Sequence, residues 1–313
     1  MAASGELLKQ TSIIVCTVDR LADLARCLQS SRPFHASVTE ILVVNNGPCG
    51  EAVEEIAKLH EAKVVTERRQ GVSRARNTGI RSALGKILVF LDDDTQASED
   101  WLPRLIAPLT DSRVDCVVGS VRAENPADPA QQAFEKILSQ GLPNRPTMLD
   151  ARAAADPFPL RMAMNGFTMN VAFRRTVFER FGYFDERFGR GTRIGSGEDA
   201  DYFFNVLRLG GRTLFEPRAV VVHRWPTARK ALRRSMFQSG CAHTAILTKY
   251  FLQEPSLRGQ ILHYAASRLR PRPAPEASSA AKLKVPRIPF LLGNLYGPLA
   301  FLLSGVESSF QGG

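Results

Sequence analysis

Short apolar runs alternate with amphipathic stretches over the first 119 residues. Runs rich in β-branched residues predict strands at residues 12–18, 40–45, 62–66 and 86–91. Apolar positions at helical spacing predict helices between them, at residues 21–30, 51–60 and 72–84. Because the apolar runs are continuous, we expect both faces of the sheet to be covered. The pattern predicts a doubly wound α/β body over about residues 11–119.

The pattern changes after Ser120. Residues 124–160 are rich in proline, alanine and charge, and only 131–138 have helical spacing, which is typical of a functional loop region. Beyond this region we expect a strand at 166–174 and a helix that begins at about residue 176. A second helix at 200–209 and a last strand at 219–223 should follow. The last strand should complete the sheet as a mixed one.

The C-terminal part of the chain has a pattern of its own. Residues 228–251 have helical spacing and carry four cations in their first two turns, Arg229, Lys230, Arg233 and Arg234. Residues 270–281 are rich in proline, alanine and serine and predict a linker. The run 288–306 is almost wholly apolar, but it is interrupted by Gly293, Asn294, Gly297 and Pro298. We expect it to insert shallowly into a membrane rather than to span it; packing on the body or a dimer contact is the alternative.

Composition excludes several classes of protein. The chain has 313 residues, 44% of them apolar and 23% charged, which is typical of a soluble globular protein. Its five cysteines include no Cys-x-x-Cys pair, so the sequence argues against a disulfide framework or a thiolate zinc site and favours a reducing compartment. The N-terminal residues lack a secretory signal pattern, and we expect a cytoplasmic protein.

Charge is distributed unevenly. The formal net charge is +10, and from Arg208 onward there are 16 Lys and Arg residues against 4 Asp and Glu. A basic block of this kind is typical of a surface for nucleic acid, anionic lipid or a phosphorylated substrate, or it is simply a solvated helix face.

Three consecutive carboxylates, Asp92, Asp93 and Asp94, directly follow the strand at 86–91. In open α/β sheets, ligands bind at the carboxyl ends of strands. Adjacent carboxylates repel one another unless a positive partner joins them, and a hard divalent cation is the usual partner. Alternation along an extended segment would place Asp92 and Asp94 on one side and Asp93 on the other. A polar strand end that caps the next helix is the alternative.

Residues 71–79, with the sequence GVSRARNTG, form a second candidate segment. Gly71 allows a tight turn, and the guanidinium groups of Arg74 and Arg76 suit phosphate oxygens. An amphipathic helix with solvated arginines is the alternative.

A third segment, 195–201, delivers Glu198 and Asp199 to the start of a predicted helix. A carboxylate there either caps the helix or acts as a general base toward an acceptor hydroxyl. His223 ends the last predicted strand, where a histidine is more often a hydrogen-bonding residue than a metal ligand. Trp225 follows it, either in the core or at an interface.

Together these segments resemble the inverting family-2 glycosyltransferases of the GT-A fold, over about residues 12–250. The resemblance rests on seven segments in the same order: Ile13-Ile14-Val15-Cys16-Thr17-Val18-Asp19-Arg20, Leu42-Val43-Val44-Asn45-Asn46-Gly47, residues 71–79, Phe90-Leu91-Asp92-Asp93-Asp94, Asn170-Val171-Ala172-Phe173-Arg174, Gly182-Tyr183-Phe184-Asp185-Glu186 and Gly197-Glu198-Asp199. It implies a GT-A fold, with a doubly wound, mostly parallel mixed sheet, helices on both faces and a C-terminal helical extension.

The resemblance also implies roles for individual residues. The nucleotide-sugar donor would contact Thr17, Asp19, Asn45, Arg76, Asp92 and Asp93. Mn²⁺ or Mg²⁺ would be held by Asp92, Asp94 and His223. Asp199, with Glu198 beside it, falls at the position of the general base. Many members have an aspartate that pairs with uracil where this chain has Asn45, so UDP, dTDP and GDP all remain open.

The expected organisation is a catalytic domain at 1–226, with a donor half at 11–119 and an acceptor half at 120–226, then a basic helical extension at 227–269, a linker at 270–287 and an apolar tail at 288–313. The resemblance implies a glycan or lipid-linked acceptor in surface polysaccharide synthesis. We expect peripheral contact with anionic lipid at the inner face of the cytoplasmic membrane. We expect no nucleic-acid partner, because the acidic strand ends would repel a phosphate backbone.

Two other functions are alternatives to this one. A sugar-nucleotide nucleotidyltransferase would normally have a glycine-rich loop after its first strand, and residues 16–20 contain no glycine. A non-catalytic basic module that binds lipid is the other alternative.

Overall fold

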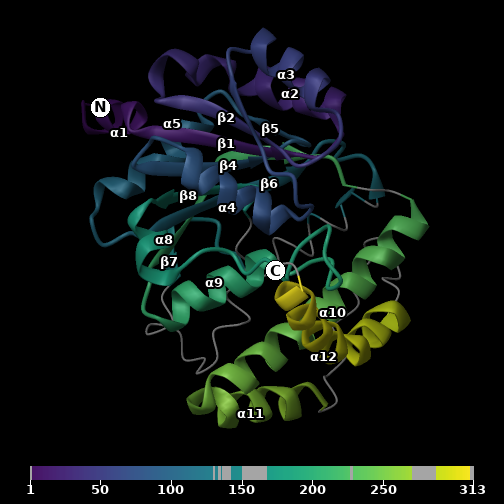
Figure 1. The fold of residues 1–313 in the computed structure, drawn as a ribbon. Coiled ribbons are helices and arrows are strands. Elements are labelled where there is room, and N and C mark those ends of the chain that lie inside the picture. Colours follow the sequence, from purple (N-terminus) through teal and green to yellow (C-terminus); the bar gives the residue numbers. More distant parts are fainter. Residues whose placement is uncertain are drawn as a thin grey trace.

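The computed structural model describes residues 2–129, 131–132, 135, 142–149, 168–225, 228–269 and 287–310. In these residues a mixed sheet lies between layers of helices, and two long C-terminal helices extend from one side (Figure 1). The predicted α/β class, the mixed sheet and the C-terminal helices are confirmed.

Nine strands of the described residues form one sheet. The strands are β1 (Thr11–Thr17), β2 (Glu40–Asn45), β3 (Lys63–Thr66), β4 (Ile87–Asp92), β5 (Thr95–Ala97), β6 (Cys116–Ala123), β7 (Thr147–Leu149), β8 (Asn170–Arg174) and β9 (Thr213–His223). Their order is β3-β2-β1-β4-β8-β6-β9-β5, and β7 also pairs with β9. The first four in this order run parallel to one another. β8 runs antiparallel to both β4 and β6, while β6 and β9 are parallel.

Helices cover both faces of the sheet. The helices are α1 (Ala2–Lys9), α2 (Leu21–Ser31), α3 (Gly50–Leu59), α4 (Val72–Ser82), α5 (Trp101–Ile106), α8 (Thr176–Phe181), α9 (Glu198–Arg208), α10 (Arg229–Gln253), α11 (Arg258–Leu269) and α12 (Arg287–Phe310), with short 3₁₀ turns at Arg32–Ser37, Ala107–Thr110 and Pro255–Leu257. One core joins the sheet to α2, α3 and α5. The other joins its opposite face to α4, α8, α9 and α10, and aromatic rings such as Phe90, Phe173 and Tyr202 fill it.

The expected elements agree with the structure over residues 11–92, whereas α1, β5 and α5 were not predicted. All four strands predicted there are present, because each is a continuous apolar run. β9 begins at Thr213, earlier than expected, and α9 begins at Glu198 rather than at residue 200. β6 was not predicted, and it extends past residue 119, where the α/β body was expected to end. Most of the helix expected at 131–138 and the linker at 270–281 lie outside the described residues.

The apolar tail is one helix that packs across α10. Glycines make the contact close: a Cβ on Gly293 would lie 2.0 Å from the Phe237 carbonyl oxygen, and one on Gly240 would lie 2.1 Å from that of Phe290. Small residues spaced four apart, as at Gly293 and Gly297, let helix backbones approach in this way. The tail therefore packs on the body, the alternative raised above. In the described part of the chain no helix has the length and apolar character needed to cross a bilayer.

Pro298 lies inside α12 and cannot donate a hydrogen bond to the carbonyl of Asn294. The Thr244 hydroxyl of α10 donates to that carbonyl instead, at 2.9 Å. A contact from a neighbouring helix thus supplies the hydrogen bond that proline removes, and the helix continues to Phe310.

We expect Thr244→Val to lower the free energy of unfolding by about 1–3 kcal/mol, because it leaves the half-buried Asn294 carbonyl without a donor. Thr248→Val is the matched control, since the Thr248 hydroxyl bonds only within α10, to Thr244 O at 2.8 Å. Urea denaturation of both variants measures the difference. Equal losses in the two variants would contradict the role assigned to Thr244.

Candidate active site

The carboxyl ends of β1, β2 and β4 meet at one edge of the sheet. Thr17 is in register with Asn45, and Cys16 is in register with Asp92. The parallel pairing of these strands therefore gathers three sequence-distant candidates at one place. Thr17 and Asn45 are buried there, and Asp92 is partly exposed.

The three consecutive carboxylates are divided between two arginines. Asp92 Oδ1 lies 3.4 Å from the Arg76 guanidinium. Asp93 is fully buried, accepts a hydrogen bond of 2.7 Å from the Thr17 hydroxyl and pairs with Arg20. Asp94 also pairs with Arg20. The alternation expected of an extended segment is wrong here, because residues 93 and 94 form a turn that directs both carboxylates toward Arg20.

Arg20 is a site residue that the sequence reasoning missed. It follows Asp19 directly after β1, and only the turn at 93–94 shows that it faces two carboxylates. Burial raises the pKa of Asp93 to about 7, and the Arg20 charge opposes that rise. For Asp94, burial also acts to raise the pKa, but the His223 contact and Arg20 outweigh it and hold the pKa at about 2. Asp94 therefore stays ionised at neutral pH.

His223 lies where the sequence suggested, beside the acidic cluster. β5 and β9 pair antiparallel with Thr95 opposite His223, which brings His223 Nε2 to 3.2 Å from Asp94 Oδ1. Its other nitrogen, Nδ1, is buried and has no hydrogen-bond partner. The Trp225 ring packs on the imidazole, with the ring centroids 4.0 Å apart.

Arg76 is the centre of a second charged group. It lies on α4, is 3% exposed, and contacts Glu198 Oε1 at 2.9 Å and Asp199 Oδ1 at 3.2 Å, besides Asp92. Burial disfavours the charged guanidinium, but the three carboxylates more than compensate and raise the pKa of Arg76. Arg76 thus links the end of β4 to the start of α9.

Asp199 sits in the first turn of α9, after Gly197 in the left-handed conformation at φ 91°. The Thr168 backbone N–H donates to Asp199 Oδ2 at 3.2 Å, and the Thr168 hydroxyl donates to Oδ1. Burial raises the pKa of Asp199 to about 7, against the opposing charge of Arg76. A carboxylate with a pKa near neutrality suits a general base.

Lys249 of α10 anchors the start of α9. Its ammonium lies 2.7 Å from Asp201 Oδ2 and 2.9 Å from Asp185 Oδ2. Burial raises the pKa of Asp201, with Lys249 opposing. The pKa of Asp185 is lowered because Arg187 and Lys249 together outweigh its burial. The helix that presents Asp199 is therefore joined to α10 by the ion pair between Lys249 and Asp201.

The remaining donor-site candidates differ in their surroundings. Asn45 Oδ1 accepts the Gly47 N–H at 3.1 Å. Asp19 is exposed at the end of β1. Asn46, which the sequence reasoning did not assign, accepts the Gly71 N–H at 2.8 Å and so ties the β2 edge to the segment that carries Arg76.

The donor set at this edge is compatible with a hard divalent cation. Three or more His, Cys, Asp or Glu side chains do not gather as a preformed metal cluster in the described residues. A cation of the Mg²⁺ type is, however, commonly held by one or two carboxylates and the phosphates of its substrate. Asp94 is ionised and lies 3.2 Å from His223 Nε2, so a carboxylate and an imidazole nitrogen already face each other here and fit such a site.

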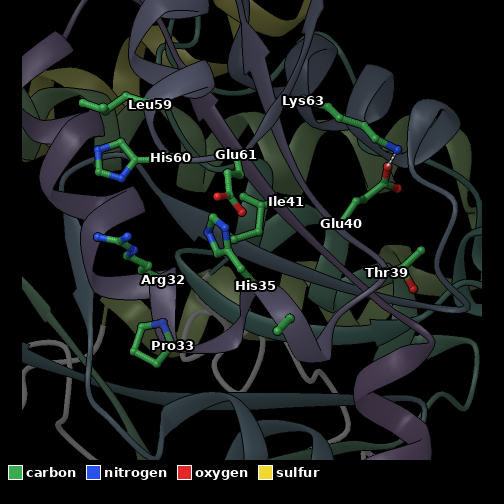
Figure 2. Close-up of a pocket in the computed structure, with 11 residues that line it drawn as sticks. Arg32, Pro33, His35, Thr39, Glu40, Ile41, Leu59, His60, Glu61 and Lys63 are labelled. Carbon is green, nitrogen blue, oxygen red and sulfur yellow. Dashed lines mark hydrogen bonds and ion pairs between the residues drawn. The ribbon is translucent and has the colours of Figure 1, made fainter.

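A separate hollow of about 400 Å³ lies at the opposite edge, where β2 and β3 begin (Figure 2). Within it Lys63 Nζ lies 3.0 Å from Glu40 Oε2, and the Glu61 carboxylate lies near the His35 ring. This hollow is remote from the carboxyl ends of the strands, and the candidate site remains the edge that holds Asp92.

Comparisons with known proteins agree with this geometry. The family described as glycosyl transferase family 2 matches residues 12–182. The succinoglycan biosynthesis protein ExoM of Rhizobium meliloti is 27% identical over 246 residues, which are 75% of this chain and 74% of that protein. The chain spans less than half the length of several other curated relatives.

Two solved structures share the fold. The mannosyltransferase PcManGT of Pyrobaculum calidifontis, in complex with GDP-Man and Mn²⁺, aligns with a TM-score of 0.56 at 18% identity, over 97% of this chain and 88% of that one. The glucosyl-3-phosphoglycerate synthase of Mycobacterium tuberculosis, in complex with Mn²⁺, UDP and glucosyl-3-phosphoglycerate, aligns with a TM-score of 0.53 at 19% identity, over 79% of this chain and 83% of that one. The matched region covers more than half of the chain and contains the β4 edge, and this protein belongs to glycosyltransferase family 2, with the GT-A fold.

Proposed function

We propose that this enzyme transfers a sugar, with inversion, from a nucleotide-diphosphate donor to a glycan or lipid-linked acceptor in surface polysaccharide synthesis. The observation that carries the proposal is the position of Arg76, between Asp92 at the end of β4 and Asp199 at the start of α9. The Arg76 guanidinium thus contacts both a carboxylate at the end of β4 and the candidate base at the start of α9.

The donor would lie across the ends of β1, β2 and β4, on Thr17, Asp19, Asn45, Arg76, Asp92 and Asp93. Both structural neighbours were solved with a nucleotide, GDP-Man in one and UDP in the other, which supports a nucleotide sugar but not a particular base. Asn45 can donate as well as accept, and it is compatible with either.

Asp92, Asp94 and His223 would hold Mn²⁺ or Mg²⁺. The Mn²⁺ present in both structural neighbours supports a divalent cation. The bound ion would supply positive charge to the departing diphosphate. Arg76 would add to that charge from α4. Arg190 is exposed, and it lies close enough to Asp94 to help lower the pKa of that carboxyl. It offers a further positive charge near the proposed metal ligands.

Asp199 would remove the proton of the acceptor hydroxyl as that oxygen attacks the anomeric carbon from the face opposite the diphosphate. Thr168 fixes the carboxylate through two hydrogen bonds, and the first turn of α9 sets its height above the sheet. Glu198 pairs with the same arginine and is the alternative base.

A panel of UDP, dTDP and GDP sugars, each with and without Mn²⁺, tests the donor. A ligand that binds the native state raises the melting temperature by mass action. We expect one nucleotide class to raise it, and only with the divalent cation present. A panel with no shift at millimolar nucleotide sugar would contradict the proposal.

We expect the turnover number to depend on pH through Asp199. Its pKa is raised to about 7, so the proton-accepting form prevails above this pH. Turnover should fall about tenfold for each unit below pH 6 and level off above pH 8, because only the ionised carboxylate accepts a proton. Steady-state kinetics at saturating donor measure the profile. A turnover number unchanged between pH 5 and 8 would show that another group is the base.

We also propose that the enzyme works at the inner face of the cytoplasmic membrane. The basic C-terminal part and the apolar α12 support this location, as does the likeness to a succinoglycan biosynthesis protein. The surface that would make the contact follows from the packing of α12.

A further inference from the structure

The outward face of α12 carries a row of exposed apolar side chains. Their exposed fractions range from 51% to 79%, and the row consists of Ile288, Leu291, Leu292, Leu295, Leu299 and Leu302. Their spacing places them on one face of the helix. Figure 1 shows α12 lying across α10.

The opposite face of α12 is fixed, so the row cannot turn inward. A Cβ on Gly297 would lie 2.3 Å from the Cys241 carbonyl oxygen, and one on Gly293 would lie 2.0 Å from that of Phe237. Thr244 adds the hydrogen bond to Asn294. Rotation of the helix would force larger side chains into these backbone contacts.

Almost all of the net charge of the protein lies in the same part of the chain. Residues 228–313 contain 12 Lys and Arg against 3 Asp and Glu, while the chain as a whole carries +10. Lys230, Arg233 and Arg234 are exposed near the start of α10, the helix on which α12 packs. Pairing two copies through α12 would bring two such cationic parts together, whereas an anionic surface would attract them.

We propose that the outward face of α12 is an interfacial surface that lies in the headgroup region of a bilayer rich in anionic lipid. The helix would lie in the plane of the membrane, with its leucines among the acyl chains and the cations of α10 near the lipid phosphates. This inference specifies the membrane contact that the proposed function includes, and it rests on that function only for the identity of the acceptor.

The same helix contacts the loop that leads to the candidate base. The Arg187 guanidinium lies 4.4 Å from the centre of the Phe301 ring, and the Phe188 and Phe301 ring centroids are 6.2 Å apart. The Ser73 hydroxyl of α4 donates to the Phe188 carbonyl at 2.8 Å. Membrane contact through α12 would therefore place the Asp199 side of the site close to the lipid surface, where a lipid-linked acceptor is anchored.

Flotation of the full-length protein with vesicles tests the inference. The vesicles are phosphatidylcholine alone or an equal mixture with phosphatidylglycerol. The test variant is Leu295→Glu with Leu299→Glu, and the matched control is Leu59→Glu with Leu84→Glu. The control leucines are 79% and 68% exposed, against 79% and 51% for the test pair, and they lie far along the chain on the donor half.

We expect the native protein and the control to float with the anionic vesicles and not with the neutral ones. The test variant should lose at least about tenfold in its partition coefficient, because charge replaces apolar side chains in the interface. High salt should weaken binding of the native protein. Unchanged melting temperatures of both variants would show that folding is intact.

Three outcomes would overturn the inference. In the first, test and control variants bind equally; in the second, the native protein binds neither vesicle. In the third, light scattering without lipid finds a native dimer and a monomeric test variant, which would make the row a contact between two copies. Transfer of sugar to a soluble acceptor is measured separately. Its absence in all proteins, with flotation intact, would contradict the proposed function and leave the membrane surface standing.

Discussion

Asp199→Asn should lower the turnover number by about 10²–10⁴ while changing nucleotide affinity little. Asparagine keeps the size of aspartate and can still accept the Thr168 N–H, but it cannot take a proton. The partner geometry should survive, because Arg76 keeps Glu198 at 2.9 Å and Asp92 at 3.4 Å. Turnover at saturating donor and a nucleotide dissociation constant, measured on the same preparation, separate catalysis from binding.

Glu198→Gln is the control for this experiment. It removes one contact of Arg76 but leaves the carboxylate whose pKa is raised to about 7. We expect the larger loss in Asp199→Asn. If Glu198→Gln is inactive and Asp199→Asn is nearly normal, the base is Glu198 and the proposed assignment of the pair is wrong.

Asp94→Asn should weaken Mn²⁺-dependent donor binding by about a hundredfold or more. Mutation of residues that only hydrogen-bond to metal ligands lowers metal affinity by about 10- to 100-fold, and Asp94 is proposed as a ligand itself. Native Asp94 is held ionised by His223 and Arg20. The fold should survive, since Arg20 retains Asp93. Isothermal titration of the nucleotide sugar with and without EDTA measures the effect.

Asp100→Asn is the matched control, because it removes one carboxylate from an exposed ion pair with Arg104 outside the site. It should bind the donor normally. Equal donor affinity of Asp94→Asn and the native enzyme in Mn²⁺, or native turnover that EDTA leaves undiminished, would refute the metal assignment.

The donor half of the fold could be predicted from sequence because its strands are continuous apolar runs. β5 and β7 could not, because three residues are too short to show a period. β6 contains Gly119, which interrupts its apolar run and packs against Asn170 and the Ala219 backbone. The glycines and the proline of the tail suggest a broken helix, yet tertiary contacts to α10 keep α12 continuous.

The candidate site was partly predictable for a related reason. Asp92, Asp199 and His223 could be named because each lies at the end of an apolar run or at a glycine-rich turn. Their partners could not be named from spacing: Arg76 contacts Asp199 across 123 positions of the chain. Arg20 reaches Asp93 because of the turn at residues 93–94. Thr168 reaches Asp199 because it lies just before the antiparallel strand β8.

The pairing of β5 with β9 also has a consequence for folding kinetics. Asp94 lies just before β5, and its partner His223 ends β9, so their contact closes a loop of more than a hundred residues. Closing so long a loop costs entropy before any contact offsets it, and non-local pairings of this kind slow folding. The β1–β2–β4 part of the sheet forms from nearer segments. We expect the contact between Asp94 and His223 to form in the last and slowest refolding phase, after β1, β2 and β4 have paired.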